Sequence, residues 1–517
     1  MKHSVKGDLS ILLVVVLMIM LVPSCFADDD VGRDKLSISC SSFTPGLNWM
    51  TDDIMYYNWK NRLQELTNTE LVYVGNRFQC LSTETLLLMI ADDSLPDLYW
   101  GPDLFASTST APSVMIEDGY LLKLNDYMDQ LPNFSRYLEE NPEYAASIML
   151  EDGTLFGFPV ITSQIVTKGL LVRGDWLEEL NMDIPKTPEQ LKEFLYAARD
   201  VLGVEHPLQF QSEFLDYIMP RGWDNSGTQW YVEDGKVKIG ITEPGYKEFV
   251  EEVHEWYAEG LIDPDMPSAS KQSVEAAMSN GTAAAVYNQI YKVENMYDFN
   301  KDNPSYTVLG TNLGASDDEL PYFGGVEGGV AWADAMYINP KTENLDAALR
   351  FCDFMFSKEG IILNNYGTRG FSFDYDEEGN YIEAGVLLDN TIDVTNVNKL
   401  YAVAKRGSWP GIVEGQLFGF IKPSVDVGKE WLKTRAMEHS IPYLVFTEEE
   451  NSRYAPAWND SSTLVRESVI QFVMGTKPMD EFDAFMEQLY EYGIEECIAI
   501  RQAAYDRYLN TLNMLIE

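Results

Sequence analysis

Six tryptophans lie in predicted loops, where an indole ring can contact a ligand or pack beneath the loop. The chain has 11 tryptophans and 29 tyrosines, and its aromatic share is 12%. Indole rings stack on flat apolar faces, while neighbouring polar side chains bind polar groups at the edges. The chemistry that this set supports is non-covalent recognition. The six are Trp49, Trp100, Trp223, Trp332, Trp409 and Trp458.

Polar side chains accompany these tryptophans. Asp103 follows Trp100, which ends a predicted strand, and Asn288 follows another strand at its carboxyl end. Glu327 lies between two glycine pairs, which let a backbone approach a ligand closely but equally serve a tight turn. Each of these groups either contacts a ligand or has a purely structural role. The polar candidates are Asp103, Gln164, Asn288, Glu327 and Arg369.

The sequence lacks the usual motifs of covalent and metal chemistry. It has no Gly-x-Ser-x-Gly element, and the glycine-rich stretch at 324–329 lacks the spacing and the lysine of a phosphate loop. The stretch from Asp374 begins like a calcium loop, but its twelfth position is Gly385, so a hairpin turn is predicted instead. The remaining histidines, His206, His254 and His439, are too scattered for a metal site. We predict no metal and no cofactor.

The chain is strongly acidic. Its 517 residues include 82 Asp and Glu against 37 Lys and Arg, so the formal net charge is −45. Such a surface repels nucleic acid, and we expect no nucleic-acid partner. Hydrophobic residues make up 45% of the chain, which indicates a folded protein. Its length exceeds what one core supports, so two or more lobes are expected.

The N-terminus has the pattern of an export signal. Lys2 and Lys6 precede an apolar run from Leu9 to Val22, which is too short for a stable membrane span. The run leads to Ser24-Cys25, which looks like a bacterial lipobox. We therefore predict a signal peptide at 1–24, a lipid on Cys25 and a linker at 25–34.

Cleavage after Ala27 is the alternative, because Cys25-Phe26-Ala27 resembles an ordinary small-x-Ala cleavage site. Pro23 and Asp8 are also unusual in a lipoprotein signal. The other cysteines match no zinc or redox motif. Cys40 and Cys80 either form a disulfide with each other or are free buried thiols. The four are Cys40, Cys80, Cys352 and Cys497.

Strand and helix patterns alternate along the first hundred residues. We predict strands at 35–41, 71–74 and 98–100, with helices at about 52–66 and 84–90 between them. This alternation implies parallel strands joined by helical crossovers.

A second α/β pattern begins with a predicted strand at 168–172. Thr187-Pro188 starts a helix over 187–200, with the capping residue and the proline in their favoured places. Asp-Gly marks the turn of a hairpin at 230–239, and the chain is mostly helical from about 424 to its end. Two α/β lobes with more than one crossing segment form the expected layout of a hinge-bending clamshell.

Five blocks of sequence, in order, resemble those of a known family. They are 152–159 (DGTLFGFP), 169–189 (with RGDWL and PKTPE), 255–264 (EWYAEGLIDP), 366–380 (ending DEEGN) and 482–508 (ending AAYDRY). Together they are similar to family 1 of the extracellular solute-binding proteins, in the lipoprotein subgroup of Gram-positive bacteria that serves oligosaccharide importers. Thr368-Arg369 departs from the pattern, because many members have an acidic residue there.

The resemblance implies an α/β fold, a two-lobe, periplasmic-binding-protein-like clamshell of type II. Parallel-dominated sheets flanked by helices, hinge strands and a helical C-terminal part are expected. Lobe 1 would comprise 35–160 plus 312–370, and lobe 2 would comprise 161–311 plus 371–517. The hinge would include 156–161.

The resemblance also implies a function. A carbohydrate, bound in the cleft between the lobes, would be delivered to the transmembrane subunits of an ABC permease. The chain would be a monomer with no catalytic activity, anchored through Cys25 at the extracellular face of the cytoplasmic membrane. The alternatives are a sensor subunit or a non-sugar binder of the same fold, and a surface glycoside hydrolase, which would need a pair of acid/base carboxylates.

Overall fold

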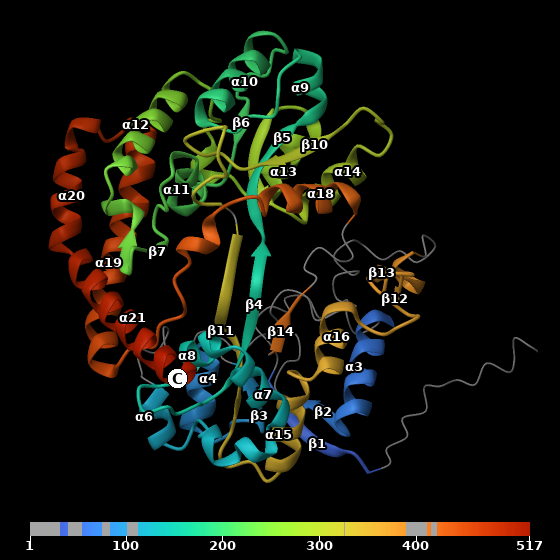
Figure 1. The fold of residues 1–517 in the computed structure, drawn as a ribbon. Helices are drawn as coiled ribbons and strands as arrows, with labels where there is room; N and C mark the ends of the chain where they lie inside the picture. The colour runs from blue at the N-terminus through green and yellow to red at the C-terminus, as the bar shows by residue number, and fades with distance from the viewer. Residues whose placement is uncertain are drawn as a thin grey trace, which may run out of the picture.

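The computed structural model describes residues 32–39, 54–74, 83–100, 112–324, 326–388, 411–414 and 421–517. These residues form two lobes, each built around a β-sheet and covered by helices (Figure 1). This is the two-lobe α/β clamshell that the sequence predicted. Cys25, the signal peptide, Cys40 and Cys80 lie outside the described residues.

The first lobe contains a six-stranded sheet. Its order is β14 (Gly411–Val413), β4 (Phe158–Val166), β11 (Val326–Ile338), β3 (Leu98–Trp100), β1 (Asp34–Ile38) and β2 (Thr69–Tyr73). Helices α3 (Ile54–Thr67) and α4 (Thr83–Ala91) connect β1 to β2 and β2 to β3, and these three strands run parallel. The alternation of strand and helix patterns therefore predicted the correct topology for these three strands.

Helices pack around this sheet and enclose an aromatic core. Phe134, Phe158 and Phe356 lie with ring centroids 4.7–6.3 Å apart and are almost fully buried. Burying such rings is a large apolar contribution to stability. The other helices of this lobe are α6 (Pro112–Glu117), α7 (Pro132–Glu140), α8 (Pro142–Ile148), α15 (Leu345–Phe354) and α16 (Lys358–Tyr366).

The second lobe contains a four-stranded sheet. Its order is β10 (Val308–Thr311), β5 (Lys168–Arg173), β9 (Ala285–Gln289) and β6 (Leu208–Gln209). In the described residues, one of its three neighbouring pairs is parallel, against three of five pairs in the first sheet. The expectation of parallel-dominated sheets is therefore wrong for this lobe. The reason is that β5 runs away from the lobe junction while β9 and β10 return toward it.

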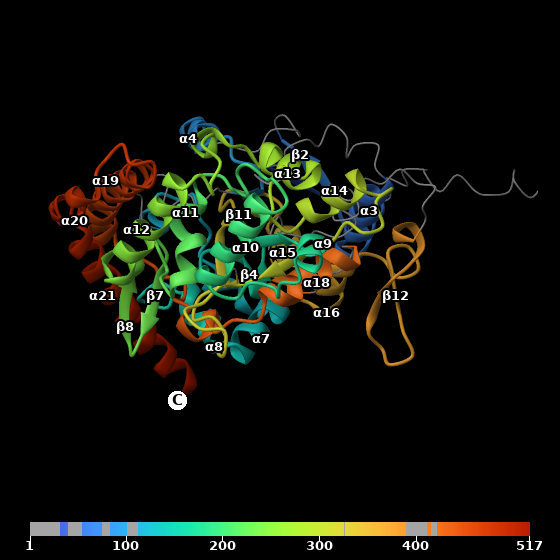
Figure 2. The ribbon, with the colours of Figure 1, turned by 90° about the horizontal axis from the view of Figure 1, so that it is seen from above.

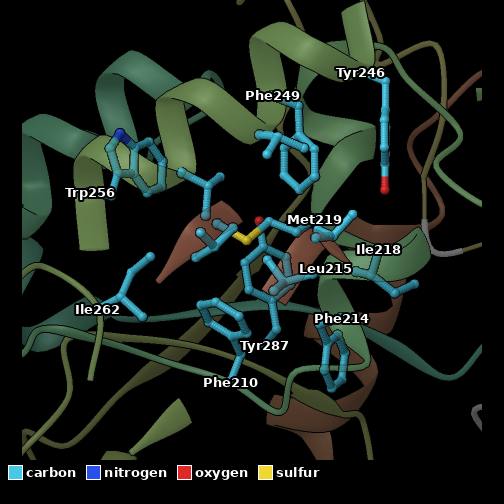
Figure 3. Packing of buried hydrophobic residues seen from close by; sticks show 14 of the residues in the cluster. Phe210, Phe214, Leu215, Ile218, Met219, Tyr246, Phe249, Trp256, Ile262 and Tyr287 are labelled. Carbon is cyan, nitrogen blue, oxygen red and sulfur yellow. The ribbon is translucent and has the colours of Figure 1, made fainter. Parts of the chain in front are cut away.

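Both faces of the second sheet are covered. Tyr287 of β9 packs against Phe210 and Phe214 on one face, beneath helix α12 (Gly245–Ala258) with its buried Trp256 (Figure 3). The opposite face meets α13 (Lys271–Asn280), α14 (Lys292–Phe299) and α18 (Lys422–Trp431). Coverage on both faces explains the nearly continuous apolar sequence of β5.

Further elements of the second lobe include a short hairpin and several helices. The hairpin turns at Asp234-Gly235, as predicted. The elements are α9 (Gly174–Leu180), α10 (Pro188–Asp200), α11 (Phe214–Tyr217), η2 (Met219–Trp223), β7 (Trp230–Glu233) and β8 (Lys236–Ile239).

The long strands β4 and β11 pair antiparallel and run from one lobe to the other (Figure 1). Their register shifts between Glu327 and Gly329 and again between Ala331 and Met336. Such bulges bend a strand locally. These strands include part of the predicted hinge segment, 156–161.

A long segment leads from α18 through η6 (Ala436–His439) and residues 440–447 into the C-terminal helices. These are α19 (Glu448–Val473), α20 (Phe482–Glu491) and α21 (Ile494–Ile516), which lie beside one another at one side of the molecule (Figure 2). The start of α21 is buried in the second core through Ile494 and Ile500, while its later part lies against α8 of the first lobe (Figure 1). The predicted helical C-terminal part is present, and it contacts both lobes.

The predicted lobe boundaries need correction at three segments. The hairpin of β12 (Phe373–Tyr375) and β13 (Tyr381–Glu383) stacks on Tyr366 of the first lobe, and β14 joins the first sheet, although 371–517 was assigned to lobe 2. Conversely, Leu313 lies in the second core, although 312–370 was assigned to lobe 1. Such short segments have no periodicity that would reveal their partner. The other boundaries remain a prediction.

Two further features concern the cysteines and the length of the apolar helices. Cys352 and Cys497 are free and buried, as expected for structural thiols. In the residues with assigned structure, no helix combines the length and apolarity needed to cross a bilayer.

Candidate functional site

A cavity of about 450 Å³ lies where the hinge strand β11 meets both lobes. The first lobe contributes Pro112 and Phe156, and β11 contributes Gly328 and Val330. The remaining described lining comes from 441–446, α19 and α21. Its members are Ile441, Pro442, Tyr443, Leu444, Val445, Phe446, Asn451, Tyr454, Ala455, Trp458, Asn459 and Arg501.

Aromatic rings of α19 form one wall of this hinge cavity. Tyr454 and Trp458 are four residues apart on the helix, and their rings stack with centroids 6.3 Å apart and planes 17° apart. The ring of Trp230 in β7 packs against that of Trp458 at a centroid distance of 5.4 Å. A capping box of Thr447 and Glu450 fixes the start of α19, so this wall is built on a regular element.

Polar groups lie among these rings. Asn451 and Asn459 line the cavity from α19, and Arg501 reaches it from α21. The Arg501 Nε donates a hydrogen bond to the Tyr454 hydroxyl at 2.8 Å. The hinge cavity thus combines flat apolar surfaces with amide and guanidinium groups, the combination that suits a ligand with both polar edges and apolar faces.

A second cavity of about 280 Å³ adjoins the first and shares Gly328 and Ile441 with it. It is lined by Arg221, Ser226, Gln229, Trp230, Tyr231, Phe323, Gly324, Ala436, Met437, His439 and Ser440. The His439 ring stacks on Tyr322 at a centroid distance of 3.8 Å, which fixes η6 against the segment that precedes β11. The Arg221 guanidinium donates to the carbonyl oxygen of Gly324.

Polar residues also gather at the edge of the second sheet that faces the hinge. Lys168 opens β5 and pairs in register with Gln289 at the end of β9. The Lys168 ammonium group lies 3.6 Å from a Glu213 carboxylate oxygen and donates to the Tyr217 hydroxyl. Gln289 Oε1 is buried and accepts no hydrogen bond within the described part of the chain.

Asn288 lies at the carboxyl end of β9, as its sequence position predicted. Its side chain is 1% exposed, and its Oδ1 accepts a hydrogen bond from the Gln289 backbone N–H at 2.8 Å. Its Nδ2 has no partner within the described part of the chain. Contact between Asn288 and a ligand stays a prediction.

Trp223 and Arg369 have protein partners. Trp223 ends η2, and its ring lies 5.1 Å from Phe249 and 5.6 Å from Trp256, so it packs on the second core. Arg369 is exposed in the first lobe, 2.9 Å from the Asp374 carboxylate and over the Tyr375 ring. The observed contacts of both side chains are those of a purely structural role. Ligand binding by either residue stays a prediction.

Seven predicted site residues have no described side chain. Trp49, Asp103 and Trp409 lie outside the described residues. Trp100 lies in β3, Gln164 in β4, and Glu327 and Trp332 in β11, and only their backbones are described. Gln164 was expected beyond the hinge strand but lies within it, while Glu327 pairs in register with Ile165. The pairing of β4 with β11 thus brings the backbones of Gln164 and Glu327 close together in space.

Sequence reasoning missed most of the hinge cavity. Trp458 was placed in a loop, but it lies in α19, and Tyr454 and Arg501 were not singled out at all. The spacing of Asn451, Tyr454, Ala455, Trp458 and Asn459 is the signal that was available, because residues three or four apart share one helix face. Nothing in the local sequence shows that Arg501 joins them.

The described side chains form no cluster suited to a metal ion. Among the described residues, no three or more His, Cys, Asp or Glu side chains cluster as a cation site would require. The stretch from Asp374 forms the predicted hairpin, with Asp376 accepting hydrogen bonds from the backbone N–H groups of Glu378 and Asn380.

The chain is similar in sequence to known solute-binding proteins. Residues 51–362 match the family model described as bacterial extracellular solute-binding protein. The chain is 26% identical over 435 residues to the fructooligosaccharide ABC transporter substrate-binding protein FusA of Streptococcus pneumoniae serotype 4, covering 75% of this chain and 76% of that protein. It is 22% identical over 379 residues to the polygalacturonan/rhamnogalacturonan-binding protein YtcQ of Bacillus subtilis strain 168, covering 69% and 73%.

Solved structures share the fold. The alginate-binding protein AlgQ2 superposes with a TM-score of 0.71 at 22% identity, over 92% of this chain and 98% of that chain. A solute-binding protein from Bifidobacterium longum infantis, described as binding HMO, superposes with a TM-score of 0.70 at 17% identity, over 92% and 99%.

Proposed function

The chain belongs to the bacterial extracellular solute-binding protein family, and from this premise we propose that it captures an oligosaccharide for an ABC importer. The carbohydrate would bind in the hinge cavity between the lobes. The transmembrane subunits of the permease would receive it, and the chain itself would catalyse no reaction.

The composition of the hinge cavity carries this proposal. A sugar ring has hydroxyl groups around its edge and apolar C–H faces above and below. Trp458 and Tyr454 offer a stacked aromatic wall for such a face, while Asn451 and Asn459 offer amides to hydroxyl groups. A volume of about 450 Å³ is within the range of small-molecule sites.

Binding would be coupled to lobe closure. A ligand that touches Phe156 of the first lobe and Trp458 of the second gains contacts when the lobes approach, so it stabilises the closed state. The paired strands β4 and β11 would accommodate the rotation at their bulges. We further propose that the protein acts as a monomer at the extracellular face of the membrane, held by a lipid on Cys25.

Calorimetry and thermal shifts with a panel of mono- and oligosaccharides test the proposal. A ligand that binds only the folded state raises the melting temperature. For the sugar that raises the melting temperature most, Trp458→Ala should lower the affinity roughly 30-fold, as expected when a central aromatic contact is truncated. Trp458→Phe should retain most of the affinity.

The matched control is Tyr490→Ala, which removes an exposed aromatic ring of α20 outside the cavity and should leave binding unchanged. A panel in which no carbohydrate binds would contradict the proposal. So would the release of new reducing ends, because turnover would make the chain an enzyme.

A further inference from the structure

The described lining of the two adjoining cavities is free of carboxylates. The chain has 82 Asp and Glu residues, yet none of the described lining residues of either cavity is acidic. The same lining contains two arginines, Arg501 in the hinge cavity and Arg221 in its neighbour. Within the described lining, two arginines and no carboxylate, in a chain with a net charge of −45, favour a ligand that carries negative charge.

Arg501 is the group best placed to bind such a ligand. Its guanidinium lies over Trp230 at 4.6 Å, Tyr454 at 5.0 Å and Phe446 at 5.6 Å from the ring centroids. Its Nε is satisfied by the Tyr454 hydroxyl at 2.8 Å. The described residues provide neither a carboxylate within 4.0 Å nor an acceptor for its Nη groups.

This arrangement differs from that of arginines nearby. Arg453 of α19 lies 3.2 Å from a Glu496 carboxylate oxygen, and Arg507 of α21 lies 2.5 Å from a Glu450 carboxylate oxygen. Arg501 has aromatic rings where these have carboxylates. The rings hold the guanidinium in place by cation–π contact, and among the residues that the structure describes no carboxylate pairs with its Nη edge.

The local charge outweighs the charge of the whole molecule at contact distance. Surface carboxylates repel an anion, but salt screens their field over about 8 Å at physiological ionic strength. A ligand carboxylate on Arg501 would lie at hydrogen-bond distance, inside a cavity of lower dielectric where the attraction is stronger. The flat guanidinium edge also matches the two oxygens of a carboxylate.

We propose that the hinge cavity binds an acidic sugar unit, with its carboxylate on Arg501 and its ring face on the Tyr454–Trp458 wall. This inference rests on the proposed function and narrows its ligand class to oligosaccharides that contain uronic acid. Neutral oligosaccharides of the same length would bind more weakly, because they leave the Arg501 Nη groups without an anionic partner.

The test compares each acid with its neutral methyl ester. Calorimetry would use trisaccharides of galacturonate and of mannuronate, and the methyl ester of each. The wild-type chain should bind at least one of the acids roughly 10- to 100-fold more tightly than its ester, the range expected for hydrogen bonds to a charged group. The preference should shrink as NaCl is added.

Variants locate the effect. Arg501→Met should lower the affinity for the acid more than the affinity for its ester and so remove the preference, and Arg501→Lys should retain part of the preference. Arg453→Met is the matched control, because Arg453 is half-exposed, paired with Glu496 and absent from the described cavity lining. It should keep the preference. If Arg501→Met fails to fold, the wild-type comparison of acid and ester decides.

The outcomes separate the two proposals. Equal binding of acids and esters, or binding of neutral oligosaccharides only, would overturn the acidic-sugar inference and leave the proposed function standing. A preference that survives in Arg501→Met would overturn it as well. Failure of every carbohydrate to bind would overturn both.

Discussion

The carboxylate of Asp353 accepts a hydrogen bond from the backbone N–H of Phe134, with 2.9 Å between the nitrogen and Oδ1. The same carboxylate accepts from the backbone N–H and the side-chain amide of Asn133, at 2.8 and 2.7 Å. Asp353 belongs to α15, while Phe134 lies in the first turn of α7. A distant side chain thus caps α7, whose own N-cap residue, Leu131, forms no side-chain cap.

Asp353→Ala should lower the free energy of unfolding by about 2–3 kcal/mol. The change leaves N–H groups at the start of α7 without an acceptor in a largely buried position, since Asp353 is 6% exposed. Urea denaturation followed by circular dichroism would measure it. Asp118→Ala, at an exposed carboxylate of the same lobe, should change the stability by less than about 0.5 kcal/mol. Equal effects of the two substitutions would contradict the capping role.

Thr187→Ala should destabilise the second lobe by about 1 kcal/mol. Thr187 is the N-cap of α10, its side chain accepts a hydrogen bond from the Gln190 backbone N–H at 3.2 Å, and Pro188 occupies the first helical position. Thr187→Ser keeps the acceptor and should retain most of the stability. Thermal denaturation of the two variants would show the difference, and a serine variant as unstable as the alanine variant would argue for lost packing instead of lost capping.

The two capping interactions show what the sequence could reveal about the fold. The Thr187 cap and the Asp234-Gly235 turn involve neighbours in the chain, so their residue types predict them directly. The contact between Asp353 and Phe134 spans 219 positions, and the pairing of β14 with β4 spans about as many. No local pattern encodes such contacts, because they arise only when the elements pack.

The hinge cavity likewise combines features that local sequence predicts with contacts that arise only when the elements pack. Trp458 was noticed for its residue type, but Pro456 and Asn459 beside it are poor helix formers, and the capping box that begins α19 lies at Thr447. The capping box nevertheless marks the start of a helix, so the helical spacing of Tyr454 and Trp458 was predictable from the sequence despite these poor helix formers. The approach of Arg501 from α21 depends on how the C-terminal helices pack, so it required the structure.

Gly169→Ala should destabilise the second lobe by about 1–3 kcal/mol. An added Cβ would lie 2.5 Å from Cε2 of the Trp431 indole, which packs across β5 and donates from Nε1 to the Leu170 carbonyl oxygen at 3.0 Å. Both groups are buried, so the ring or the strand must shift.

A double-mutant cycle with Trp431→Phe would test whether the clash with the indole is the cause. The smaller ring of Trp431→Phe should relieve part of the effect of Gly169→Ala, which gives a coupling free energy different from zero. Chemical denaturation of the four chains supplies the values. Strictly additive losses would show that the two residues act independently.

Asp216→Asn should make the protein more stable relative to wild type as the pH rises from 4 to 7. Burial raises the pKa of Asp216 to about 6, with Arg466 opposing the shift and Glu213 adding to it. The Arg466 Nε lies 3.6 Å from Asp216 Oδ2, and the Asp216 side chain is 14% exposed. The folded chain therefore keeps a proton on Asp216 at pH values where the unfolded chain has lost it.

The sign of this linkage is fixed by the raised pKa. The stabilising contribution of the Asp216 proton is complete below about pH 3.8 and is lost as the pH rises through 6, up to about 2–3 kcal/mol. Asparagine has no such proton, so the difference in unfolding free energy between Asp216→Asn and wild type should grow in favour of the variant. Urea denaturation at pH 4, 5, 6 and 7 would measure that difference.

Asp152→Asn is the control with the opposite expected slope. Hydrogen bonds from the Thr154 side chain and backbone lower the pKa of Asp152, so its charged form stabilises the fold above pH 4 and this contribution is lost as the pH falls. The Asp152→Asn variant should therefore lose stability relative to wild type as the pH rises. A constant difference between Asp216→Asn and wild type across the range would contradict a buried, proton-binding Asp216.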